Sequence, residues 1–329
     1  MPQIIRFHWG KRVSLRDSCL HLSKWYCAML AFRTLVIVFF LLMSSVSGFA
    51  AETHGPEGGA GVEHHGLTPG PVELFRLGPL AITNSMVVTW IVAGLIISLS
   101  QMATRNAKLV PSGLQNFWEW LVESLYGFFE SIVGAELVKK TFWFFATIFI
   151  FILFTNWFGL VPGLGTIGWG AVDADGHFHM TEPLLRGVNA DLNMTSAMAL
   201  TFFVLWIIWA IQANGVQGVL GHIFAVKGHG FNFMGLFLAL VFIFVGLIEI
   251  VSISVRPVAL MFRLYGNIFA GENILETVMH LGGIWFGWLF VLPFYLLEIL
   301  VGLVQALVFA LLTSVFTALI CVHHGKQAH

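Results

Sequence analysis

Five apolar segments, each about as long as a membrane-crossing helix, constrain this chain more than any other feature. They cover residues 82–102, 141–161, 195–213, 233–278 and 284–322. A helix rises about 1.5 Å per residue, so about 20 apolar residues cross the hydrocarbon of a bilayer. Hydrophobic residues occupy 58% of the 329 positions and charged residues 10%, a balance that a water-soluble globule does not show. We expect an all-α membrane protein with five membrane segments.

The N-terminal residues have the pattern of a targeting segment. Residues 1–33 hold six basic residues and one acid, and residues 34–43 form a short apolar core. Small residues near Ala50 then match the spacing of a signal-peptidase site. We predict a signal peptide over 1–50, with an uncleaved first span or a start at Met29 as alternatives. Residues 51–80, rich in Gly, Pro and His at their start, are predicted to be an external flexible arm, and 81–325 the membrane domain.

The distribution of basic residues predicts the orientation of the chain. With an external mature N-terminus, six basic residues fall on the cytoplasmic side and two outside, as the positive-inside rule requires. We therefore expect a bacterial inner-membrane protein with a periplasmic mature N-terminus and a cytoplasmic C-terminus. The six are Arg105, Lys108, Lys139, Lys140, Lys227 and Lys326, and the two are Arg76 and Arg186.

A sixth helix is predicted between the first two spans, at residues 111–134. Its large apolar residues repeat on one helical face, and its polar residues Gln115, Glu119, Glu123 and Glu130 avoid that face. We expect an amphipathic helix that lies on the cytoplasmic surface or against a partner. The apolar face is predicted to contain Phe117, Trp118, Leu121, Leu125, Phe128 and Phe129.

The last two segments are too long to stand upright in a bilayer. As continuous helices, 233–278 and 284–322 would measure about 69 Å and about 58 Å, roughly twice the apolar thickness. A long tilted hairpin with bends at Pro257 and Pro293 accommodates that length.

Six charged residues lie inside this hairpin, although a charge at mid-membrane costs at least about 2.5 kcal/mol. Spacings of seven place Glu249, Arg256 and Arg263 on one stripe of the first helix, and Asn267 extends it. On the second helix Glu298 and Gln305 are also seven apart. The six are Glu249, Arg256, Arg263, Glu272, Glu276 and Glu298.

Arg263 differs from the other charges because no acid lies three or four residues away from it. Its counter-charge must come from another helix or another protein, whereas Arg256 and Glu249 are equally well explained as a salt bridge. Arginine keeps its proton, so it supplies a fixed charge. Carboxylates can exchange ions. The topology places Glu249 cytoplasmic of Arg263, Glu272 and Glu298 external to it, and Gln305 near its depth, which suggests two polar half-paths.

Other functions lack support in the sequence. The formal net charge is −1 and no GxxxxGK[ST] loop occurs, so we expect neither a nucleic-acid partner nor nucleotide binding. After the predicted cleavage only Cys321 remains of the three cysteines, and the histidines of the arm are read as a solvated tail. We therefore expect no cofactor and no metal site.

A long motif connects the hairpin to a known family. The run Phe262–Glu272, FRLYGNIFAGE, closely resembles the R-L-x-G-N-x-x-A-G-E signature of subunit a of F-type ATP synthases. Further resemblance lies in PSGLQN at 111–116, NWFGLVPG at 156–163, DLNMT at 191–195, and Gln305-Ala306. Some relatives have histidine at the position of Glu298.

The resemblance implies roles for residues and partners. Arg263 would be the essential arginine facing the ring of c subunits, with Glu249 in the cytoplasmic half-path. The external half-channel would contain Asn267, Glu272, Glu298 and Gln305. The b subunits of the peripheral stalk, the remaining ATP synthase subunits and the lipid bilayer would be the other partners, and the coupling ion would be a proton or sodium. Two alternatives are a stand-alone secondary transporter or ion channel, and a structural scaffold for other membrane subunits.

Overall fold

The computed structural model describes residues 71–77, 80–105, 107–108, 110–164, 167–172, 178–224 and 233–322. All of these belong to the larger of two compact units, Met43–His329. The predicted signal peptide and most of the predicted arm lie outside the described residues. The end of the arm is described, and residues Glu73–Leu77 form a strand there.

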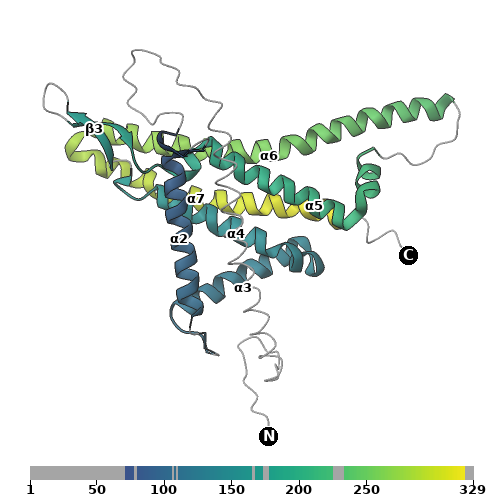
Figure 1. Cartoon of the computed structure of the whole chain (residues 1–329), viewed down its shortest axis with the longest axis horizontal. Coiled ribbons are helices and arrows are strands. Elements are labelled where there is room, and N and C mark those ends of the chain that lie inside the picture. Colours follow the sequence, from purple (N-terminus) through teal and green to yellow (C-terminus); the bar gives the residue numbers. More distant parts are fainter. Residues whose placement is uncertain are drawn as a thin grey trace, which may run out of the picture. The chain divides into compact units, whose positions relative to one another are not determined.

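The five predicted membrane segments are confirmed as helices that are long and apolar enough to cross a membrane. The chain is an all-α membrane protein in its main architecture (Figure 1). Helix α4 begins six residues before the predicted span, and α5 is broken at Gly215, where φ is 69°. The helices are α2 (Asn84–Thr104), α4 (Ala135–Gly159), α5 (Leu192–Phe224), α6 (Phe233–Leu281) and α7 (Gly283–Val322).

The predicted amphipathic helix is α3 (Leu114–Val133). Trp118, Leu125 and Phe129 are buried as expected, but Phe117 of the predicted apolar face is 50% exposed. Gln115, predicted to avoid that face, is buried. Its amide donates to the carbonyl oxygen of Lys108 at 3.0 Å and its oxygen accepts from the Lys108 N–H at 3.1 Å. This exchange of hydrogen bonds explains how a polar side chain replaces an apolar one in the interior.

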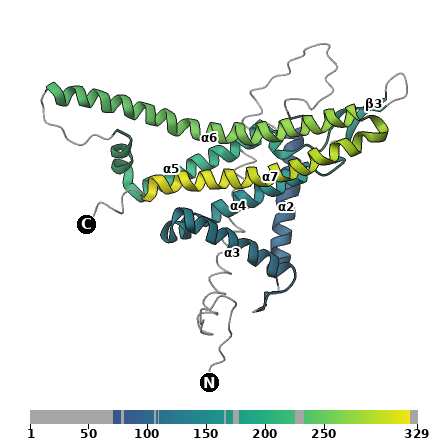
Figure 2. The same cartoon turned by 180° about the vertical axis from the view of Figure 1, so that it is seen from behind.

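Helices α6 and α7 form the predicted long hairpin, with 49 and 40 residues. They are joined at Gly283, whose φ of 62° lies in the left-handed region that glycine adopts without strain. Pro257 and Pro293 lie inside the two helices. Figures 1 and 2 both show α6 and α7 running alongside each other in opposite directions.

Two short β-hairpins accompany the helices and were not predicted. Strands β1 (Glu73–Leu77) and β2 (Leu80–Thr83) pair antiparallel directly before α2. Strands β3 (Gly168–Val172) and β4 (Phe178–Pro183) pair antiparallel between α4 and α5. A single 3-10 turn, η3 (Val188–Ala190), follows β4 and leads into α5.

Helix α4 lies at the centre of the bundle and α6 at its outside. In the most apolar 18-residue window of each helix, 67% of the α4 residues are buried and only 11% of the α6 residues. Phe144 and Phe145 of α4 pack their rings edge-on against Trp209 of α5. A largely uncovered apolar helix needs lipid or another protein against it.

Candidate functional site

Two glutamates of the hairpin come together next to η3. The Glu272 carboxylate of α6 lies directly against Gly187, and its Oε1 is 3.6 Å from where a Cβ on Gly159 would stand. Glu298 of α7 is buried against Gly271, one residue before Glu272 in α6. Glu298 and Glu276 act on Glu272 as like charges, and Arg186 as an opposite charge. The structure therefore joins two predicted ion-path residues in one acidic group.

Buried polar side chains from neighbouring segments lie near these acids, and we call them, together with the two acids, the η3 cluster. The Asn189 amide donates to Thr155 Oγ1 at 2.8 Å and to Asn156 Oδ1 at 2.6 Å. The amide of Asn156 then donates to the carbonyl oxygen of Gly302 in α7 at 2.9 Å. These hydrogen bonds tie the end of α4 to α7 beside Glu298. The cluster consists of Thr155, Asn156, Arg186, Asn189, Asp191, Glu272 and Glu298.

Asp191 closes the cluster at the start of α5. Its carboxylate accepts hydrogen bonds from the Ser85 hydroxyl of α2 and, at 2.9 Å, from the backbone N–H of Asn193. Burial raises the pKa of Asp191 above its ordinary value, while the hydrogen bonds and the charge of Arg186 act in the opposite direction. The Asp191 carboxylate thus binds α2 through Ser85 and caps the start of α5 through Asn193. Together these two hydrogen bonds fix the position of η3, which directly precedes Asp191.

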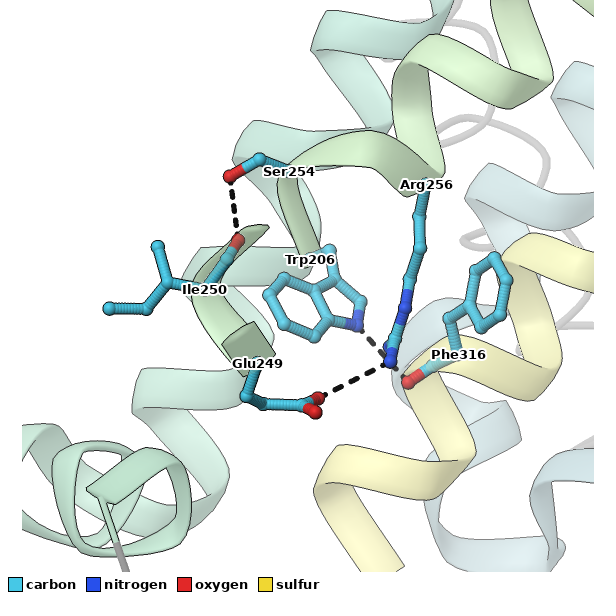
Figure 3. A network of polar contacts seen from close by, with 6 residues as sticks. All are labelled: Trp206, Glu249, Ile250, Ser254, Arg256 and Phe316. Atoms are coloured by element: carbon cyan, nitrogen blue, oxygen red, sulfur yellow. Dashed lines mark hydrogen bonds and ion pairs between the residues drawn. The ribbon is translucent and has the colours of Figure 1, made fainter. Parts of the chain in front are cut away.

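A second charged group lies farther from η3, where α5, α6 and α7 meet (Figure 3). Arg256 Nη2 lies 3.4 Å from Glu249 Oε1, and the guanidinium carbon lies 4.9 Å from the centre of the Phe316 ring. The indole N–H of Trp206 donates to the carbonyl oxygen of Phe316 at 3.1 Å. The salt bridge considered from sequence is thus present, and a cation–π contact attaches it to α7.

Arg263 lies between these two groups along α6 and is exposed. Leu260, Leu264 and Ile268 are buried on another face of the helix. Among the described residues no acid forms an ion pair with Arg263, in contrast to Arg256. An arginine on an exposed apolar face of a membrane helix needs a counter-charge, which the described residues do not supply.

The remaining predicted site residues separate into two kinds. Asn267 continues the exposed stripe of Arg263, one turn along α6. Gln305 is half-buried on α7, two turns after Glu298. The large apolar side chains exposed around the Arg263 stripe are Val255, Val258, Phe262 and Ile274.

Sequence reasoning did not assign a role to Arg186 or Asn189. Arg186 entered only as one of two external basic residues, and Asn189 did not enter at all. Their side chains are buried in the η3 cluster, which depends on contacts between segments far apart in the chain. The sequence carries no signal for this role, because loop arginines are ordinarily exposed and the burial of Arg186 is visible only in the fold.

Comparison with known proteins agrees with this architecture. Residues 86–318 match the family described as ATP synthase A chain. ATP synthase subunit a of Moorella thermoacetica is 33% identical over 248 residues, which are 75% of this chain and 95% of that protein. The Gloeobacter violaceus subunit a is 31% identical over 73% of this chain and 85% of its own length. The Mycobacterium leprae subunit a is 31% identical over 77% and 90%. With a hairpin of this length and matches along most of its membrane helices, the chain belongs to the ATP synthase A chain family.

Proposed function

We propose that this chain is the ion-translocating stator subunit of a rotary F-type ATP synthase, and that Arg263 faces a ring of c subunits. The observation that carries the proposal is the position of Arg263. It is exposed on α6, the helix least covered by its own chain, and it has no acid partner among the described residues. A carboxylate on a neighbouring subunit would supply the missing counter-charge.

The two charged groups on either side of Arg263 serve as separate half-paths. An ion enters from the periplasmic side at the η3 cluster, passes Glu272 and Glu298, and neutralises a c-subunit carboxylate. Asn267 and Gln305 line the inner end of this route. After the ring has turned, the ion leaves past Glu249 to the cytoplasm. This order is supported by the separation of the two acidic groups along α6.

Arg263 keeps the half-paths apart by electrostatics. Its fixed positive charge displaces the ion from an arriving carboxylate and repels a cation that would cross directly. Glu298 Oε1, which is buried and accepts no hydrogen bond from the described residues, is an open position for a passing ion. The chain itself needs no nucleotide site for this task, because synthesis occurs on other subunits. The peripheral stalk, through its b subunits, would hold the chain still.

Reconstitution separates this function from that of a stand-alone transporter. We expect purified chain in liposomes to carry no ion flux, and the same chain assembled with c subunits and the rest of the complex to pump ions on addition of ATP. Fluorescent pH or sodium dyes inside the vesicles report the flux. Ion or solute transport by the chain alone would favour the transporter instead.

A further inference from the structure

The contact between Glu272 and the segment before η3 is unusually close for a charged side chain. A Cβ at Gly187 would overlap the Glu272 carboxylate, whereas a Cβ at Gly159 would stand 3.6 Å from Oε1, at ordinary contact distance. The backbone of Gly187, with φ −53° and ψ 126°, is open to any residue. The missing side chain at Gly187 is therefore what makes room for the carboxylate.

Arg186, the residue beside this glycine, is fixed by its own contacts. Its side chain is buried, and Nη2 donates to the carbonyl oxygen of Ala190 across η3 at 3.1 Å. Its charge also acts on Asp191, whose carboxylate is anchored to Ser85 and Asn193. A guanidinium held in this way cannot follow a passing ion, so it provides a constant field.

The charges facing Glu272 come from three elements. Glu276 lies one turn along α6, Glu298 of α7 lies against Gly271, the residue before Glu272, and Arg186 directly precedes Gly187, which the Glu272 carboxylate contacts. Two like charges would drive the Glu272 carboxylate away from this place, whereas the Arg186 guanidinium, alone among the described residues that act on it, attracts it. Gly187 therefore leaves space for the Glu272 carboxylate, and Arg186 attracts it.

We infer that Arg186 is a positioning residue that, with the space left by Gly187, holds the Glu272 carboxylate at the entrance of the ion path. The inference rests on the proposed function, because Glu272 matters only if ions pass it. Arg186 and Gly187 do not themselves exchange the ion. They keep Glu272 beside Glu298, close enough for the two acids to act as one relay.

Charge variants test the role of Arg186 in the whole complex. In inverted membrane vesicles, with pumping normalised to assembled complex, we expect R186Q to lower ATP-driven pumping about tenfold, because the buried Glu272 carboxylate is then no longer held in place by an opposite charge. R186K keeps the charge and is expected to recover most of the rate. Pumping by R186Q within about twofold of wild type, or an R186K rate as low as that of R186Q, would overturn the inference.

Glycine variants test the space for Glu272 independently. G187A is expected to lower pumping, and G187A/E272D to pump faster than G187A, because the shorter acid leaves room for the methyl group. The matched control is G94A, where nothing lies within 4 Å of the added Cβ, and G159A is also expected to be mild. Wild-type pumping by G187A, or no gain in the double variant, would count against the inference.

Arg263→Ala in the same vesicles distinguishes a failure of the Arg186 positioning role from a failure of the proposed function. If R263A stops pumping while R186Q and G187A pump normally, the positioning role fails and the proposed function stands. If R263A pumps normally, the proposed function fails first.

Discussion

Arg263→Ala abolishes ATP-driven ion pumping and coupled ATP synthesis if the fixed charge on α6 separates the two half-paths. The alanine variant leaves the c-subunit carboxylate without its counter-charge at the passing point. Pumping is measured by quenching of a pH-sensitive or sodium-sensitive dye in inverted vesicles.

Lys139→Ala is the control for removing a cation from the same chain. Lys139 lies 3.1 Å from Glu136, with side-chain exposures of 61% and 93%, and exposed pairs of this kind contribute little. We expect this variant to pump at the wild-type rate. Normal coupling in the Arg263→Ala complex, at normal assembly, would refute the electrostatic role of Arg263.

The second large effect is expected for Glu272→Gln. Glutamine keeps nearly the same shape beside Gly187 but can neither take up a proton nor bind a cation by charge. Loss of a relaying acid costs about a hundredfold in comparable proton transfers. We therefore expect a reduction of that order in both pumping and synthesis, with the amount of assembled complex unchanged.

Glu123→Gln is the matched control, since Glu123 is an exposed acid on α3, outside both charged groups. It is expected to leave pumping unchanged. If the two variants pump at equal rates, Glu272 has no part in the ion path.

The membrane helices could be predicted from the sequence because lipid imposes a simple rule. Inside a bilayer, a sufficiently long apolar segment forms a helix. The segments that correspond to α6 and α7 are longer than the bilayer is thick, so a tilted hairpin could be predicted from their length. Helix α4 begins at Ala135, six residues before the apolar segment predicted at 141–161. The first turns of the helix contain Lys139 and Lys140, so hydropathy excluded them from the predicted span. Hydropathy identifies the residues that lie in the apolar part of the bilayer, but it does not show where the helix begins or ends.

The candidate site was only partly predictable. Spacing placed Glu249 and Arg256 close enough to interact, and the structure pairs them. The absence of an acid near Arg263 in sequence also has its counterpart in the described fold. The same reasoning could not show that Glu272 lies against Gly187, because 85 residues separate them and their contact depends on how η3 packs against α6. The short β-hairpins were missed because strands of four to six residues leave a weak pattern.

Photocrosslinking from α6 tests most directly whether the Arg263 face meets a c subunit. A photoreactive amino acid is placed at Phe262, which is 55% exposed beside Arg263, and as a control at Trp90 of α2, which is 41% exposed. Irradiated complexes are separated by gel electrophoresis and the adducts identified by mass spectrometry. The account predicts a c-subunit adduct from position 262 and none from position 90. Adducts with lipid alone at position 262, in a fully assembled complex, would contradict it.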